Sequence, residues 1–156
     1  MIFYDAIPCR GFLVCYGAVS PNQTHDPQST LTNRYSEWGY IETGEFTCEG
    51  NGQSVVLPSG QLTNLSQFKG HPTTLTAGDV PVMFAAFNPM QEGTMNCVLL
   101  NSNTEISGEA CVFVLNGGMG VDNKTVPAWK YLYVREGETK TVSLANGAKA
   151  VKVTFN

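Results

Sequence analysis

Hydrophobic and polar residues alternate most clearly in the last part of the chain, residues 129–156. Three short runs there are rich in β-branched and aromatic residues and are separated by turn formers: WKYLYV, TKTVSL and KAVKVTF. In the last run Val151, Val153 and Phe155 share one face, which is the period-two pattern of a strand with one buried side. Asn146-Gly147 is typical of a type I′ hairpin turn. We therefore expect residues 129–156 to form a three-stranded antiparallel meander.

Short apolar runs bounded by Gly, Pro and Asn recur through the rest of the chain. Turn signals come roughly every 8–12 residues, which is typical of a β-sandwich or barrel. Leu62, Leu65 and Phe68 are spaced by three residues, so one or two helical turns are expected there. Gly17, inside an apolar run, indicates a bulge or a close backbone approach. We predict one all-β domain over residues 1–156, an antiparallel β-sandwich or barrel with the C-terminal meander and less than about a tenth helix. The expected strands cover residues 12–19, 38–41, 45–48, 54–57, 80–87, 94–100 and 110–115.

A long polar segment at about 20–37 interrupts this pattern. It contains two prolines and almost no apolar residues, so it cannot stabilise itself by burial. We interpret it as an arm or loop that becomes ordered against a neighbouring subunit. The residues expected to contact that partner are the apolar and aromatic ones in and just after the segment: Leu31, Tyr35, Trp38 and Tyr40.

Composition and charge exclude several partners. Only 14% of the residues are charged, the formal net charge is −4, and the nine basic residues are scattered. Nucleic-acid binding needs clustered Lys or Arg, so no nucleic-acid partner is expected. No apolar stretch approaches the roughly 18–20 residues that span a bilayer, so no membrane partner is expected either. The N-terminal run lacks a basic start and contains Asp5 and Pro8, so we interpret it as structure, not a targeting signal.

The five cysteines favour a reducing compartment. Their number is odd, and Cys15, Cys97 and Cys111 lie inside apolar runs, where a thiol behaves as a small hydrophobe. A disulfide framework is the alternative. We predict that all five, including Cys9 and Cys48, are reduced.

No reactive motif emerges from the remaining polar residues. His25 and His71 lie in polar loops without a second metal ligand at a suitable spacing, so we interpret them as solvated. No local motif supports a cysteine nucleophile paired with either. Asp79, Glu105 and Glu109 form no paired-carboxylate motif. We therefore expect no metal site, no cofactor and no enzymatic activity.

Two glycine- and asparagine-containing turns also lack a ligand signature. The run Gly117–Gly120 has neither the dinucleotide fingerprint nor the Gly-Lys-Ser/Thr end of a P-loop. Asp122-Asn123 lacks the calcium-loop pattern. The Gly117–Gly120 run is expected to be a β-turn, and no calcium site is expected at Asp122-Asn123.

An aromatic face is the remaining candidate for binding. Trp129, Tyr131 and Tyr133 alternate onto one side of a predicted strand, where they could bind a sugar ring or a protein partner. The other interpretation is half of a sandwich core. The core is favoured because the opposite side, with Lys130, is the more mixed one.

Two segments carry a resemblance to a known family. LTAGDVPVMFAAF (75–87) and SGEACVFVLNGG (107–118) resemble the paired strand segments of small phage head-decoration proteins of the capsid decoration or cement type. That resemblance implies a non-enzymatic virion structural protein that folds in the host cytoplasm and stabilises a capsid lattice. Its implied partners are the major capsid protein or another virion protein, and its implied state is a homo-oligomer, often a trimer. The alternative is a carbohydrate- or receptor-binding β module, such as a fibre tip or lectin-like domain.

Overall fold

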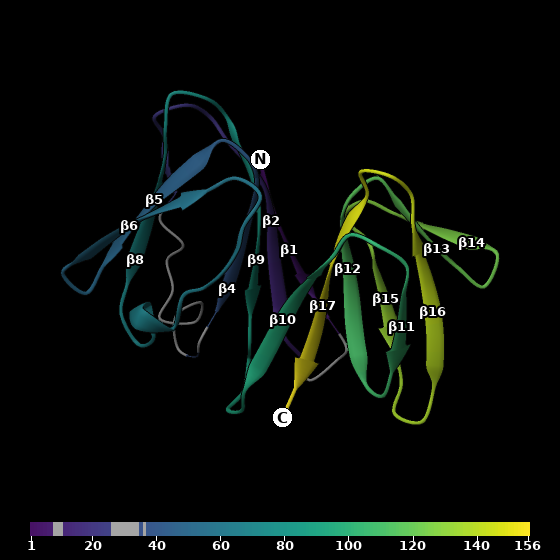
Figure 1. Cartoon of the computed structure of the whole chain (residues 1–156). Helices are drawn as coiled ribbons and strands as arrows, with labels where there is room; N and C mark the ends of the chain where they lie inside the picture. Colours follow the sequence, from purple (N-terminus) through teal and green to yellow (C-terminus); the bar gives the residue numbers. More distant parts are fainter. Residues whose placement is uncertain (8–10, 26–34, 36) are drawn as a thin grey trace. The chain divides into compact units, whose positions relative to one another are not determined.

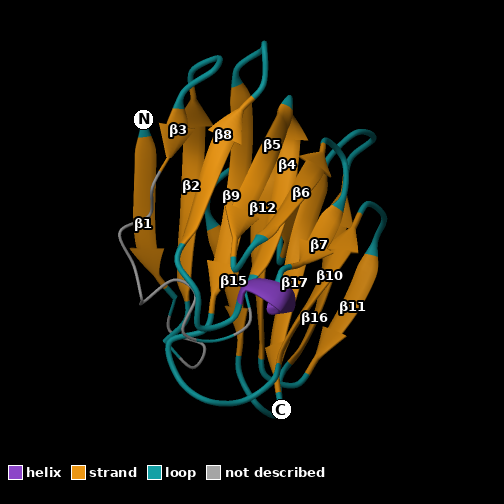
Figure 2. Cartoon of the chain, turned by 90° about the vertical axis from the view of Figure 1, so that its left-hand side faces the viewer, coloured by secondary structure: helices purple, strands orange, loops and turns teal. Residues whose placement is uncertain are grey.

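The computed structural model describes residues 1–7, 11–25, 35 and 37–156 (Figure 1). The described residues form antiparallel strands with a single short helical turn, the 3-10 helix η1 (Ser66–Phe68), as Figure 2 shows. The all-β prediction is confirmed, and the helical turn lies within the Leu62–Phe68 spacing. Within the described residues no helix reaches the length and hydropathy needed to cross a membrane.

The chain divides into two compact units, residues 1–93 (unit 1) and 94–156 (unit 2). Each unit contains its own pair of sheets. Whether residues 1–156 unfold together as one domain stays a prediction.

Unit 1 consists of a five-stranded sheet and a four-stranded sheet. Their inward faces form an apolar core that includes Phe46 and Phe84, whose rings lie edge to face with centroids 5.1 Å apart. An edge-to-face pair of aromatic rings contributes more to stability than its buried area alone. The first sheet has the order β1 (Ile2–Ala6), β2 (Leu13–Val19), β9 (Val82–Asn88), β4 (Trp38–Thr43), β7 (Leu62–Asn64). The second has the order β3 (Thr24–His25), β8 (Thr73–Ala77), β5 (Glu45–Gly50), β6 (Gln53–Pro58).

Gly17 allows β1 to pair with β2. It pairs with Ile2, its φ is +146°, and a Cβ at this position would lie 2.1 Å from the carbonyl oxygen of Met1. Only glycine permits so close a backbone approach. The close approach expected from the sequence is confirmed.

Unit 2 consists of two four-stranded sheets around a separate core of Val, Ile, Leu, Ala and Met side chains. The Asp122-Asn123 turn joins two neighbouring strands, with φ of 49° and 61° at its two residues, as a type I′ hairpin requires. The β-turn predicted for Gly117–Gly120 is wrong, because Gly118–Val121 form a strand, β13, that pairs with β14. The first sheet has the order β10 (Met95–Leu100), β17 (Lys149–Phe155), β12 (Ala110–Asn116), β15 (Tyr131–Val134). The second has the order β11 (Thr104–Ser107), β16 (Thr139–Leu144), β13 (Gly118–Val121), β14 (Lys124–Pro127).

The predicted C-terminal meander is wrong, although its three strands exist. β15 pairs with β12, β16 pairs with β11 and β13, and β17 pairs with β10 and β12, so consecutive strands alternate between the two sheets. At the Asn146-Gly147 turn φ is positive at Gly147 (84°) but not at Asn146. A type I′ hairpin needs both. The dipeptide therefore reverses the chain without pairing the strands on either side.

The polar segment at 20–37 is only partly described, and its described part differs from the prediction. Thr24 and His25 form β3, which pairs with β8, and the backbone N–H of Asn22 donates to the carbonyl of Gly78 at 2.9 Å. Backbone hydrogen bonding, which needs no apolar side chains, incorporates residues 22–25 into the second sheet of unit 1. Leu31 and the rest of the proposed arm lie outside the described residues.

Candidate functional site

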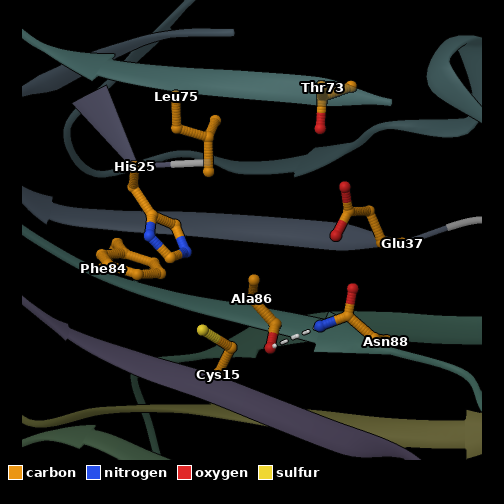
Figure 3. Close-up of a pocket in the computed structure, with 8 residues that line it drawn as sticks. All are labelled: Cys15, His25, Glu37, Thr73, Leu75, Phe84, Ala86 and Asn88. Atoms are coloured by element: carbon orange, nitrogen blue, oxygen red, sulfur yellow. Dashed lines mark hydrogen bonds between the residues drawn. The ribbon is translucent and has the colours of Figure 1, made fainter. Parts of the chain in front are cut away.

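A small cavity lies between the two sheets of unit 1, and its volume is about 20 Å³ (Figure 3). That is enough space for one water molecule. The lining residues come from both sheets: Cys15 on β2; Phe84, Ala86 and Asn88 on β9; Glu37 just before β4; His25 on β3; Thr73 and Leu75 on β8.

Strand periodicity directs these side chains inward. Phe84, Ala86 and Asn88 are spaced by two along β9 and so share one face, and Cys15 is the cross-strand partner of Ala86. On the opposite sheet His25 is the cross-strand partner of Leu75. Paired residues on facing sheets thereby converge on one interior space.

Glu37 is placed by an extension of β4. Its carbonyl oxygen accepts a hydrogen bond from the backbone N–H of Leu65 at 2.8 Å, which continues the β4–β7 pairing by one residue. Glu37 therefore lies in register with Gly39 and Ile41, on the face of β4 that looks into unit 1.

The polar side chains gather at one end of the cavity. In Figure 3 the oxygen atoms of Thr73, Glu37 and Asn88 face one another; we call these three residues the oxygen end. The Asn88 side-chain Nδ2 donates to the carbonyl of Ala86 at 3.5 Å, which directs its Oδ1 toward Glu37. All three are buried, with exposed fractions of 8% for Glu37, 4% for Thr73 and 1% for Asn88.

The other end of the cavity is apolar and aromatic. The His25 and Phe84 rings lie 6.4 Å apart between centroids, and Leu75 lies beside them (Figure 3). His25 is half-buried in a strand, and its Nε2 atom is buried. The interpretation of His25 as a solvated loop residue is wrong, because backbone pairing with β8 carries its side chain inward. His71 lies in a loop, half-buried, with its backbone N–H bonded to the carbonyl of Phe68.

Burial sets the protonation of the site. Desolvation raises the pKa of Glu37 to about 8, so its carboxyl is mostly protonated at neutral pH. Burial also raises the pKa of the Cys15 thiol to about 12, against the opposing effect of a hydrogen bond with Tyr4. A thiol in that state is a poor nucleophile. At neutral pH the Glu37 carboxyl and the Cys15 thiol are therefore both mostly in their uncharged forms.

The residues proposed as partner contacts are not part of this cavity. Tyr40 is buried, whereas Trp38 and Tyr35 are half-buried, and Leu31 lies outside the described residues. Their contact with a partner stays a prediction.

The three carboxylates considered as candidates in the sequence, Asp79, Glu105 and Glu109, do not form one site. Asp79 is exposed in unit 1, and Glu105 is exposed in unit 2. Glu109 accepts a hydrogen bond from the Tyr133 hydroxyl at 2.8 Å. No group of three or more His, Cys, Asp or Glu side chains in the described part of the chain is arranged to hold a metal ion.

The aromatic face of the 129–134 strand is not the core of unit 2. Val134 and Leu132 pack into the apolar cluster, while Tyr131 is 38% exposed and Tyr133 is half-buried. The preference for an aromatic core is therefore wrong. The opposite side of the strand buries Leu132 and Val134, and its charged residue, Lys130, lies before the first residue of β15.

Sequence reasoning missed all three residues of the oxygen end, and no strand was predicted at Thr73. Glu37 and Asn88 each lie at one end of an apolar run and continue its alternation by one step: Glu37 with Gly39 and Ile41, and Asn88 with Phe84 and Ala86. Extending the period-two pattern past the last apolar residue would have placed both on the inward face.

Comparison with known proteins shows a shared fold and no relative in sequence. No family model and no curated protein matches the sequence. The protein Ylba from E. coli superimposes with a TM-score of 0.74 at 12% identity, covering 99% of this chain and 82% of that one. A cupin 2 conserved barrel domain protein from Leptotrichia buccalis gives 0.59 at 12%, covering 100% and 89%. An oxalate decarboxylase gives 0.71 at 9%, covering 97% and 71%. The chain therefore has a cupin-like β-barrel or sandwich fold.

These neighbours overturn the resemblance to phage decoration proteins. The two segments that carried it each combine a turn with a buried strand, β9 in unit 1 and β12 in unit 2. Such segments occur in β-sandwiches generally, so they do not distinguish one family from another. The prediction of a capsid-binding virion protein is wrong, and the structural neighbours are cupin-like proteins instead.

Proposed function

We propose that this protein binds a small molecule in the cavity of unit 1. The observation that carries the proposal is the position of its buried polar side chains. Among the described residues, the polar or charged side chains classed as buried are Glu37, Thr73 and Asn88, and all three line this cavity.

Physical chemistry supports a ligand at such a place. Moving a polar group from water into an apolar core is unfavourable unless a hydrogen bond compensates it. Convergent polar groups in an otherwise apolar pocket are typical of ligand sites.

The size of the cavity limits what enters it. A volume of about 20 Å³ accommodates a single water-sized group. We infer that a ligand places one small polar group at the oxygen end, where it displaces water and bonds to Thr73, Glu37 and Asn88.

Binding without chemical change is the role that we propose first. The raised pKa of the Cys15 thiol disfavours nucleophilic chemistry. Glu37 favours a second candidate, an enzyme that uses general acid–base catalysis, because a carboxyl with a pKa of about 8 can exchange protons near neutral pH. Recovery of the bound compound after long incubation separates the two: an unchanged compound supports binding, and a converted one supports catalysis.

A thermal-shift screen with metabolite-sized compounds tests the binding proposal. A compound at about a hundred times its Kd stabilises the protein by about 2.7 kcal/mol, a readable rise in Tm. We expect the rise to be lost in Thr73→Val, which removes one oxygen of the cavity at constant shape. Thr74→Val is the matched control, since Thr74 neighbours it on β8 but points away from the cavity. A ligand that stabilises both variants equally binds elsewhere, which would overturn the proposal.

A further inference from the structure

We propose that a surface groove of unit 2 binds the main chain of an extended peptide, one residue of which pairs with Thr141. The groove has a volume of about 400 Å³, which lies within the usual size range of ligand sites. The site belongs to unit 2 alone and does not depend on the cavity of unit 1. Two strands, the turn after the first of them and the start of a third strand line it: Gly120 and Val121 of β13, Asp122 and Asn123 of the turn, Lys124 of β14, and Thr141 and Ser143 of β16.

The groove forms where two neighbouring strands stop pairing. β13 and β16 pair through Gly120 and Ser143, and the same register would next bring Asp122 opposite Thr141. Both residues belong to the described part of the chain, yet they form no ladder pair. Asp122 has a φ of 49° and begins the tight turn into β14, which carries the chain away from β16. Figure 1 shows the β13–β14 hairpin diverging from β16 beyond this point.

The backbone of Thr141 faces this groove. At the start of the β11–β16 ladder the backbone N–H of Gly108 donates to the carbonyl of Glu138 at 3.2 Å. Hydrogen-bonded pairs alternate along an antiparallel ladder, so Lys140 and Val142 are bonded to β11, whereas Thr141 directs its N–H and C=O toward β13. One donor and one acceptor of a single extended residue therefore lie side by side on the groove wall.

Another extended residue is the natural complement of such a pair of groups. Opposite residues of an antiparallel ladder exchange two N–H···O bonds, so the ligand needs one residue flanked by two peptide groups. Strand addition to an open edge obtains its affinity from these main-chain bonds. The Gly120–Ser143 pair occupies the next place along β16, so the bound segment must end or turn outward there.

The charges around the groove do not select an ion. The Asp122 carboxylate forms an ion pair with the Lys140 ammonium, and this hydrogen bond raises the pKa of Lys140. Lys124 adds a positive charge to the lining, and Glu105, the cross-strand partner of Thr141, adds a negative one beside it. Neither sign dominates, so a small ion gains little here, whereas a neutral peptide group supplies the donor and the acceptor that Thr141 requires.

Titration of the full chain with N-acetyl-trialanine N-methylamide, followed by amide NMR, tests this inference. We expect shifts centred on residues 120–124 and 141–143. The same peptide with all its amides N-methylated lacks every N–H donor and should bind at least about tenfold more weakly. Glycerol and inorganic phosphate, a hydroxylic and an anionic probe, should leave these residues unshifted.

Two variants of the groove test it independently. Thr141→Pro removes the N–H that faces the groove and leaves the β11–β16 ladder bonds intact, so we expect binding at least about tenfold weaker. Thr139→Pro is the matched control, because it removes an N–H on the same side of β16 outside the lining. Gly120→Val should fill the groove and abolish binding. A Cβ at Gly120 would lie 3.6 Å from the Cβ of Ser143, an ordinary contact, so the fold should persist.

Circular dichroism of each variant establishes that it is folded, and if Thr141→Pro fails to fold, Gly120→Val decides. Four outcomes would overturn the peptide site: no shift with the peptide, equal binding by a folded groove variant, equal binding of the N-methylated peptide, or a response to glycerol or phosphate at the same residues. None of them bears on the small-molecule proposal for unit 1, which stands or falls on Thr73→Val.

Discussion

Burial of the Glu37 carboxyl links one proton to the stability of the fold. Its pKa rises from 4.5 to about 8 on folding, because the core solvates the carboxylate poorly. Between these two values the folded chain binds more protons than the unfolded chain. Stability must therefore fall as pH rises through this window.

We expect this pH dependence to be measurable by urea unfolding. As far as Glu37 is concerned, the free energy of unfolding should be highest below about pH 4.5 and should level off above about pH 8. Between these values it should decrease by up to about 1.4 kcal/mol per pH unit. Glu37→Gln should remove that part of the slope. Glu49→Gln should retain it, and a flat wild-type profile across the window would contradict the assignment of a buried, protonated Glu37.

At the level of strands, two of the three Asn-Gly dipeptides of the chain show what local sequence can and cannot predict. Asn51-Gly52 joins β5 and β6 with φ of 48° and 69°, a two-residue hairpin between paired neighbours. Asn146-Gly147 has positive φ at the glycine only and joins strands of different sheets. Identical residues thus occupy different turns, because the partner of each strand is set by packing far along the chain.

This difference gives a prediction with an internal control. Asn51→Ala should destabilise the protein by about 1 kcal/mol, because an alanine with φ of 48° brings its Cβ too close to the carbonyl oxygen. Asn146→Ala should have a clearly smaller effect, since Asn146 has no positive φ. Chemical denaturation of the two variants measures both, and equal losses would contradict the turn assignment.

The sequence predicted the all-β class and many of the strands, but not β1, β8 or the site. Period-two alternation reports which residues of a strand face inward, so the strands at 82–88 and 149–155 were predicted within a few residues. It carries no information about which strand lies opposite. The meeting of Glu37, Thr73 and Asn88 depends on three strand pairings and so could not be predicted from local pattern.

At the level of the whole chain, the cysteines report whether the two units unfold together. Cys15 and Cys48 lie in unit 1, Cys97 and Cys111 lie in unit 2, and all four are buried. Burial raises the pKa of the Cys15, Cys48 and Cys97 thiols, so native alkylation should be slow and limited by opening of the structure.

Pulsed alkylation in rising urea, read by peptide mass spectrometry, tests the single-domain prediction. One cooperative domain requires all four thiols to become reactive with the same midpoint. Midpoints that differ between the unit 1 pair and the unit 2 pair would show two independent domains. The homo-oligomeric state also stays a prediction, and light scattering would compare the particle mass with the 16.9 kDa of one chain.

In each unit the last strand occupies an interior place in the first sheet. β9 lies between β2 and β4, and β17 lies between β10 and β12. During synthesis on the ribosome, the earlier strands of a unit therefore lack their central neighbour until the last strand of that unit has left the exit tunnel. Unit 1 can complete its sheet once residue 88 has emerged, whereas unit 2 must wait for residues 149–155. Translation thus separates the two assembly steps in time, and β10 and β12 lack their common neighbour until β17 has left the tunnel.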